Sequence, residues 1–208
     1  MASIDSLRTL LVEQLKDIYD AEKRLTKAIP KLIKKSTSDE LKTALQHHLD
    51  ETEEQVGRLE QAFEQLDMAA KARTCAGMKG LIEEGDEHAG DDYDDDGLRD
   101  AAIIGAAQRV EHYEIAAYGT AIAHARLLEL DDVVSLLTET LDEEKAADKK
   151  LTAIAESVVN LDAATEDEVR MAGRRSRGAP AMAMMGRGVS ARSSAHDRGG
   201  RAARRSRR

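Results

Sequence analysis

The stretch DDVVSLLTETLDEEKAADKKLTAIAESVVN at 131–160 places acidic side chains where an amphipathic helix should carry apolar ones. Read as one helix, its apolar stripe consists of Val134, Leu137, Leu141, Leu151, Ile154 and Val158. The positions that should continue this stripe in the middle are Glu144 and Asp148. Burying an ionised carboxylate without a partner costs several kcal/mol. This face of the helix is therefore expected to meet positive charge in the interior.

The same interruption occurs in two other helical patterns. Glu22 lies between Ile18 and Leu25, and Glu114 follows Val110 by four residues, each in a position that an apolar residue should occupy. Chance placement of single glutamates near a core face is common, because a lone glutamate can extend to solvent or pair with a lysine. Repetition at mid-length in several helices instead favours a pair of metal ions bound in the interior.

Helical periodicity organises the first 160 residues. Long amphipathic helices are predicted at about 5–35, 37–66, 98–129 and 131–160, with a short helix at 78–88. Only a few residues separate the members of each consecutive pair of long helices, which predicts two antiparallel hairpins. About thirty residues connect the hairpins. An all-α, ferritin-like four-helix bundle with a long crossover is therefore the expected fold.

Local signals predict how these helices begin, bend and end. Thr37 with Glu40 has the spacing of a capping box, and Asn160 is placed to end the fourth long helix. Pro30 is expected to bend the first helix rather than stop it, because the apolar pattern continues beyond it. The acidic run at 91–97 lacks the sixth-position glycine and the final glutamate of an EF-hand loop, so we interpret it as a solvated loop.

The two predicted hairpins repeat one acidic pattern. Leu15, Ile18, Glu22 and Leu25 fall in step with Ala107, Val110, Glu114 and Ala117. Ferritin-like metal sites take one glutamate from each of two helices, and a glutamate with a second ligand one turn away from each of the other two. The predicted metal ligands are Glu22, His48, Glu51, Glu111, Glu114, Glu144 and Asp148. The sixth ligand is left open between Gln55, His48 and water.

Carboxylate ligands with little imidazole suit two iron ions, with manganese as the alternative. The first functional hypothesis is Fe(II) oxidation by O₂ or peroxide, which protects against oxidative damage. A dimanganese centre that disproportionates peroxide is the enzymatic alternative. A helical stress scaffold, with a structural metal or none, is the third hypothesis.

Other side chains near these positions carry less weight. His112 and His124 are expected to be exposed or satisfied histidines rather than ligands, and His47 points elsewhere on its helix. Tyr118, one turn from Glu114, is either a core residue or a donor to a ligand carboxylate. Cys75 lies outside the long helices and is expected to be an inert thiol.

Charge divides the chain into a predicted helical body, 1–168, and a predicted disordered tail, 169–208. The tail holds twelve arginines and one aspartate, a net charge of +11, and the body has a net charge of −20. The tail could contact nucleic acid through phosphates, or it could bind the acidic body. A single cysteine and no predicted signal peptide or membrane span favour a soluble, cytoplasmic protein.

Five segments resemble the YciE/YciF-type ferritin-like stress protein family. They are LKDIYDAEKRL at 15–25, HLDETEEQVGRLEQ at 48–61, CAGMKGLIEEG at 75–85, RDAAIIGAAQRVEHYEIAAYGT at 99–120 and LLTETLDEEKAADKKLT at 136–152. The resemblance implies a helical, dimeric stress protein with a dinuclear metal site. The predicted acidic ligands, His48 and Gln55 match family positions. The Arg-rich tail departs from the family, whose members mostly end soon after the fourth long helix.

Overall fold

The computed structural model describes residues 4–165 and 168, and all the regular structure in these residues is helical. The elements are α1 Leu7–Lys35, α2 Asp39–Gln65, α3 Ala76–Gly90, α4 Asp96–Leu127, α5 Asp131–Ile154, a π-helical turn at Ala155–Val159, and α6 Asn160–Ala163. Helix α1 continues through Pro30, as the apolar pattern predicted. The predicted disordered tail at 169–208 lies outside the described residues.

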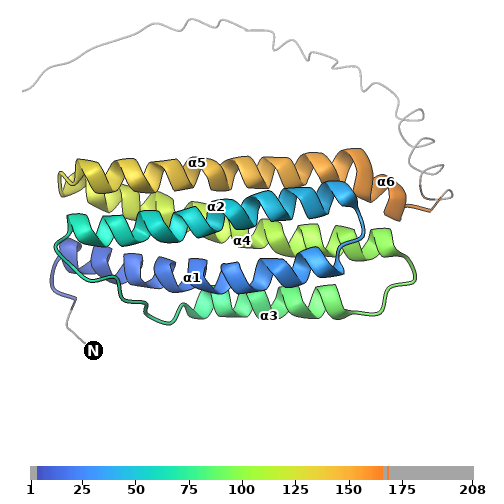
Figure 1. The fold of residues 1–208 in the computed structure, drawn as a ribbon, viewed down its shortest axis with the longest axis horizontal. Coiled ribbons are helices and arrows are strands. Elements are labelled where there is room, and N and C mark those ends of the chain that lie inside the picture. Colours follow the sequence, from blue (N-terminus) through green and yellow to red (C-terminus); the bar gives the residue numbers. More distant parts are fainter. Residues whose placement is uncertain (1–3, 166–167, 169–208) are drawn as a thin grey trace, which may run out of the picture. The chain divides into compact units, whose positions relative to one another are not determined.

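Helices α1, α2, α4 and α5 run side by side as a bundle, and α3 lies along α1 and α4 on its outside (Figure 1). Three residues, Ser36 to Ser38, join α1 to α2, and three more, Leu128 to Leu130, join α4 to α5. Such short turns force each pair to run antiparallel. The crossover between the hairpins carries α3. The expected all-α, ferritin-like four-helix bundle is confirmed.

Two predicted helix ends were wrong. Ser38, not Thr37, caps α2 and accepts a hydrogen bond from the backbone N–H of Leu41 at 3.2 Å. Thr37 is engaged elsewhere, because its hydroxyl donates to the buried carboxylate of Asp100 on α4 at 2.7 Å. Asn160 does not end a helix. The backbone passes from α5 through a π-helical turn and Asn160 begins α6.

The crossover is tied to the bundle by its own polar contacts. The backbone N–H of Cys75 donates to the carboxylate of Asp20 on α1 at 2.8 Å, and the sulfur of Cys75 caps α3 by accepting from the backbone of Met78 at 3.3 Å. The thiol also lies 2.9 Å from the hydroxyl of Tyr113 on α4. Burial raises the pKa of the Cys75 thiol, which disfavours the reactive thiolate.

The apolar core forms two clusters along the bundle. One includes Leu15, Ile18, Leu59, Phe63, Tyr118 and Leu137, and the other includes Leu25, Leu45, Ile103, Val110, Leu151 and Ile154. Each of the four bundle helices contributes to both clusters. Buried polar residues lie where these contributions meet on every helix, among them Glu22, His48, Glu114 and Glu144. A polar layer therefore separates the two halves of the core.

In the part of the chain that the structure describes, no helix combines the length and the apolar character needed to cross a membrane.

Candidate metal centre

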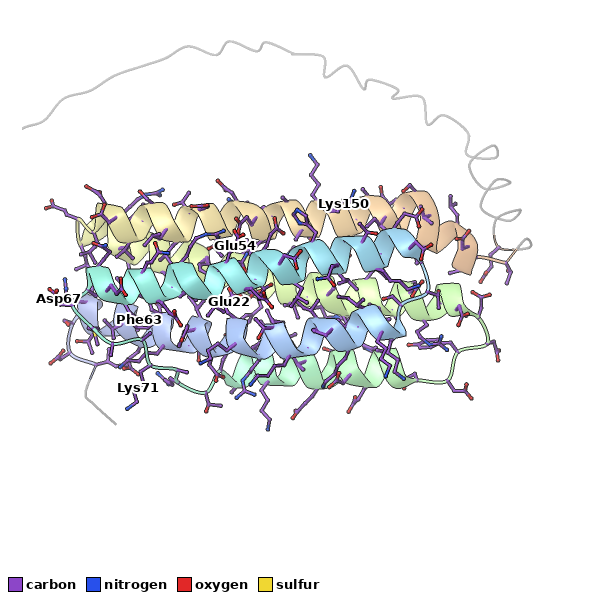
Figure 2. All side chains as sticks on the ribbon, in the orientation of Figure 1. Glu22, Glu54, Phe63, Asp67, Lys71 and Lys150 are labelled. Atoms are coloured by element: carbon purple, nitrogen blue, oxygen red, sulfur yellow. The ribbon has the colours of Figure 1, made fainter. Side chains whose placement is uncertain are left out.

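The polar layer gathers side chains from all four bundle helices. It consists of Glu22 from α1, His48 and Gln55 from α2, Glu111 and Glu114 from α4, and Glu144 from α5. Glu22, labelled in Figure 2, lies near the middle of α1. The four glutamates are at most 2% exposed, and His48 is 6% exposed. Ionisable groups this deep are rare without a partner charge or a metal.

Helix periodicity explains why these side chains face inward. On α1, Ile18, Glu22 and Leu25 follow one another at spacings of four and three residues, so Glu22 shares the core face with its apolar neighbours. The inward face of α2 runs through Leu45, His48, Thr52, Gln55 and Leu59 in the same rhythm. The apolar residues that flank each polar one hold its helix against the bundle, and this packing keeps the polar side chain inside.

Four of these residues have the geometry of a metal site. His48, Glu111, Glu114 and Glu144 each offer one ligand atom, and the four atoms lie within 4.8 Å of one another. The imidazole Nε2 of His48 is 3.3 Å from Oε1 of Glu111 and 3.9 Å from Oε2 of Glu144. Three helices thus converge on a volume that could hold a cation.

Glu22 lies at the edge of this group and connects it to α1. Its Oε1 accepts a 2.5 Å hydrogen bond from the hydroxyl of Tyr118, a fully buried residue on α4. Tyr118 is therefore both a core residue and a donor to a candidate ligand, which combines the two roles that the sequence left open. The hydrogen bond fixes one oxygen of Glu22 and leaves the other free for a metal.

Unpaired polar atoms concentrate in this layer. Among the described residues, every buried side-chain nitrogen or oxygen without a hydrogen-bond partner belongs to it: one oxygen each of Glu22, Gln55, Glu111 and Glu144, both oxygens of Glu114, and both nitrogens of His48. Each such atom costs about 1–3 kcal/mol if it stays unpaired. A cation bound among them would satisfy most of these atoms at once.

The pKa values of the buried carboxyls also show the cost of burying charge in this layer. Burial raises the pKa of Glu22 to about 8, and the negative charge of Glu144 contributes further. Burial likewise raises the pKa of Glu111, with Glu144 as the next cause, and of Glu114, with Glu22 as the next cause. Without a cation, these groups therefore hold protons that they would lose in water. A bound cation can replace those protons.

A second layer of contacts orients Glu144. The amide of Gln55 donates to Oε1 of Glu144 at 2.5 Å and to Glu143 at 3.0 Å. Arg58, which is 7% exposed, donates to both oxygens of Glu143 and to the hydroxyl of Thr140 at 2.9 Å. Arg58, Thr140 and Glu143 were absent from the predicted site. These three residues belong to a run of polar residues at helical spacing on α2 and α5, and that run is the sequence signal that could have indicated them.

Two predicted ligands lie at the rim of the layer. The carboxyl of Glu51 is 23% exposed and sits between His47, at 3.1 Å, and Nδ1 of His48, at 3.8 Å. The neighbouring imidazole of His48 is the main cause of its lowered pKa, and His47 contributes further. Glu51 faces the group from outside, so its role as a ligand stays a prediction.

Asp148, the other rim residue, is directed to polar neighbours on α4. Its carboxyl is 24% exposed, accepts a 3.0 Å hydrogen bond from Gln108 and lies 3.4 Å from Nε2 of His112. His112 is exposed, as expected. His124 contacts Gln14 at 2.8 Å, away from the site. The structure thus brings together five of the seven predicted ligands and leaves Glu51 and Asp148 beside them.

A groove of about 810 Å³ between α2 and α5 leads from the surface to this layer. Asp39, Glu40 and Glu51 line it, and its inner end reaches His48 and Glu111. Acidic side chains along a path raise the local concentration of cations. The groove, whose lining also includes Lys150 and several apolar residues, therefore connects these acidic side chains with the site.

The donor set could hold a metal ion with a preference for oxygen ligands. Four buried glutamates carry four negative charges when ionised, which equals the positive charge of two divalent cations. Carboxylate oxygens with a single imidazole suit iron or manganese better than zinc or copper. Fold and site together define a class: a ferritin-like four-helix bundle with a buried carboxylate and histidine centre.

Comparison with known proteins places the chain within that class. Residues 6–164 match the model of the family described as Domain of unknown function (DUF892). The chain is 42% identical to Protein YciF of Escherichia coli K12 over 159 residues, which cover 76% of this chain and 95% of that protein. This chain belongs to the DUF892 family of YciF-like stress proteins.

Solved structures agree with this assignment. The crystal structure of the E. coli stress protein YciF aligns with a TM-score of 0.72 and 42% identity, over 76% of this chain and 99% of that one. A Rhodopseudomonas palustris protein described as YcfI, a putative structural protein, aligns with a TM-score of 0.70 and 47% identity, over 73% of this chain and 98% of that one. A Xanthomonas campestris protein at 20% identity and a TM-score of 0.59 shares the fold.

Proposed function

We propose that this protein binds two iron ions in the polar layer and oxidises Fe(II) with O₂ or peroxide, which protects the cell under oxidative stress. The observation that carries the proposal is the concentration of all the described unpaired buried polar atoms in one group of glutamates and a histidine. The description of E. coli YciF as a stress protein supports the physiological setting.

The proposed ligands divide by their position. His48, Glu111, Glu114 and Glu144 form the group with mutually close ligand atoms, and Glu22 joins it from α1. Their carboxyls carry raised pKa values in the metal-free protein, so the uptake of divalent cations would release protons. Glu51 is ionised and open to the groove, where it would meet an entering cation first.

The chemistry is a balanced electron transfer. Two Fe(II) ions lose one electron each, and hydrogen peroxide takes up two electrons and two protons to become two molecules of water. With dioxygen as the oxidant, the same two electrons and two protons yield hydrogen peroxide. An anionic site stabilises the ferric state more than the ferrous state, and the four buried glutamates supply that negative charge.

The residues of the chain hold the site in place during this change. Tyr118 keeps one oxygen of Glu22 hydrogen-bonded, and Gln55 does the same for Glu144. Arg58 in turn holds Glu143, which accepts from Gln55. The ligands are thus pre-positioned by groups that do not themselves have to move.

Anaerobic loading with Fe(II), followed by O₂ or peroxide, tests the proposal. We expect ferric absorbance to develop in the natural protein and to be lost when Glu114 and Glu144 are both changed to Gln. A matched control replaces two exposed glutamates, Glu53 and Glu83, with Gln and should oxidise iron normally. Absence of ferric absorbance with either oxidant, or its persistence in the Glu114→Gln, Glu144→Gln variant, would refute iron oxidation at this site.

Manganese is the second candidate because an oxygen-rich donor set with one imidazole accepts it equally well. A dimanganese centre would convert two molecules of peroxide to dioxygen and two of water. Metal analysis of protein purified without added metal separates the two proposals. A protein that holds manganese and evolves oxygen from peroxide supports this alternative. Cytoplasmic location, a homodimer, contact of the tail with nucleic acid and a metal with only a structural role stay predictions.

A further inference from the structure

A second, mainly apolar pocket also reaches the candidate metal centre. It has a volume of about 30 Å³ and is lined by residues of α1, α2, α3 and α4. Its walls are mainly apolar, and Leu25, Ile29, Leu45, Leu81, Ala107 and Val110 represent them. Its inner end is formed by His48 and Glu111, two members of the candidate metal site. Helix α3, which is not part of the four-helix bundle, supplies the outer wall.

The ends of this pocket differ in character from its walls. Asp86 of α3 lines the outer end and forms a 2.8 Å ion pair with Lys31 of α1. At the inner end, both nitrogens of His48 and one oxygen of Glu111 are buried without a hydrogen-bond partner. Between these ends, the pocket offers no charged side chain. An ion would therefore lose its hydration there without compensation.

The size and lining of the pocket select its occupant. A volume of about 30 Å³ is that of one small molecule, and away from the inner end the apolar wall gives water no hydrogen-bond partner. An uncharged diatomic molecule meets both conditions. The groove between α2 and α5, which carries Asp39, Glu40 and Glu51, reaches the same two residues, His48 and Glu111. The centre thus has one approach suited to cations and another suited to an apolar gas.

We propose that the apolar pocket is a holding site for molecular oxygen beside the metal centre. Its use in catalysis rests on the function proposed above, in which O₂ oxidises Fe(II), whereas its affinity for an apolar gas does not. This assignment gives α3 a function, because Leu81, Ile82 and Gly85 of that helix form one wall of the pocket. Cations and oxygen then enter by different paths and meet at His48 and Glu111.

Gly85 allows the pocket to be filled without disturbing a ligand. This glycine lines the pocket from α3, and a Cβ atom added to it would meet only the Cβ of Ala106, at 3.6 Å, which is an ordinary contact. Gly85→Leu should therefore extend a side chain into the space that oxygen would occupy. Gly80→Leu is the matched control, because Gly80 is exposed on the same helix and has nothing within 4 Å of its added Cβ.

Xenon binding to the metal-free, full-length protein is the first test, since xenon is apolar and reports on such pockets without any reaction. We expect xenon to shift the NMR signals of the Leu25 and Val110 methyl groups in the natural protein and in Gly80→Leu. The shift should be lost in Gly85→Leu. Gly85→Ala, which adds a single methyl group, serves if the larger side chain prevents folding, and should weaken xenon binding. Absence of xenon binding to the natural protein would overturn the proposal.

Oxidation kinetics are the second test. In Gly85→Leu we expect the KM for O₂ to rise, while anaerobic Fe(II) binding and oxidation by hydrogen peroxide stay unchanged. An unchanged KM for O₂ in a variant that has lost xenon binding would overturn the role of the pocket in oxygen delivery. If neither the natural protein nor its variants oxidise iron, the proposed function fails. The xenon measurement alone then decides whether the pocket binds an apolar gas.

Discussion

Gln55 on α2 donates its amide to a carboxylate oxygen of Glu144 on α5, and both side chains are fully buried. The contact joins two helices that belong to different hairpins. It also leaves the other oxygen of Glu144 without a hydrogen-bond partner and close to His48. Gln55 therefore acts as a positioning residue that presents Glu144 to a metal. A substitution at Gln55 tests this role.

Gln55→Leu should weaken metal binding while the protein still folds. The leucine is apolar and of similar size, but it cannot hold Glu144, and loss of such an outer contact lowers metal affinity about 10–100-fold. Anaerobic titration with Fe(II) or Mn(II) measures the affinity. Gln61→Leu, the same change at an exposed position of α2, is the control. Equal affinity in the two variants would show that Glu144 needs no help from Gln55.

The metal-free protein should lose stability as pH rises from about 4.5 to about 8. The pKa of Glu22 is raised from 4.5 to about 8 in the folded state, so the folded state favours the protonated carboxyl. Its contribution is fully present below pH 4.5 and is lost as pH passes through 8. Burial raises the pKa of Glu111 and Glu114 in the same direction. Urea unfolding in a chelator, at several pH values between 5 and 8, measures the slope.

Glu22→Gln isolates the contribution of one carboxyl to that slope. The amide cannot ionise, so the free energy of unfolding should fall less steeply with pH than in the natural protein. Groups with lowered pKa values, such as Glu13 and Glu51, lose their contribution only below their ordinary pKa and do not affect this range. A free energy that is constant or increases between pH 5 and 8 would contradict the burial of protonated carboxyls.

The fold and most of the centre could be read from the sequence because helix periodicity records which face is buried. Glu22, Glu114 and Glu144 each replace an apolar residue at a spacing of three or four, and all three proved to be buried. The connection lengths predicted the hairpins for an equally simple reason. A connection of only three residues keeps two consecutive helices side by side, so they must run antiparallel.

The outcome at α2 shows where periodicity alone was insufficient. His48, Thr52 and Gln55 lie on the inward face, whereas Glu51, one position before Thr52, lies at the rim. The role of Glu51 as a ligand stays a prediction. Asp148 also lies at the rim, where Gln108 of the neighbouring helix donates to it, a contact that the local pattern does not contain. Its role as a ligand stays a prediction.

The predicted caps failed because distant residues competed for the same groups. Thr37 has the spacing of a capping box, yet its hydroxyl and backbone N–H donate to Asp100, which lies 63 residues away in the sequence. Ser38 then became the cap of α2. Similarly, nothing in the local sequence at Asn160 indicates that the preceding turn is π-helical. Such contacts are set by packing between helices.

Rim and interior carboxyls should differ in their effect on metal affinity. Glu144→Gln removes a fully buried candidate ligand and should lower the affinity by more than about 100-fold, whereas Glu51→Gln or Asp148→Asn should cost about tenfold or less. All three changes preserve size and remove one charge. Competition with a coloured chelator gives the affinities. If Glu51→Gln or Asp148→Asn equals Glu144→Gln in effect, that rim residue moves inward and becomes a ligand when metal binds.

Asp100→Ala should destabilise the fold and leave the metal centre intact. Asp100 is 2% exposed, and its carboxylate accepts hydrogen bonds from both N–H groups at 37 and 38 and from the Thr37 hydroxyl, which ties the α1–α2 turn to α4. Loss of these hydrogen bonds to a buried carboxylate should cost about 1.5–3 kcal/mol. Denaturant unfolding measures the loss, with Asp92→Ala in the exposed loop as the control.

The distance between Asp100 and the candidate metal centre leads to a second expectation for Asp100→Ala, which concerns its metal affinity. Asp100 precedes Glu111 by eleven residues on α4, about 16 Å along the helix, so its removal should not change the metal affinity of the folded protein. A stability loss with unchanged affinity would show that the turn and the centre are independent. Weaker metal binding in Asp100→Ala would instead show that the α1–α2 turn sets the position of His48 or Glu22.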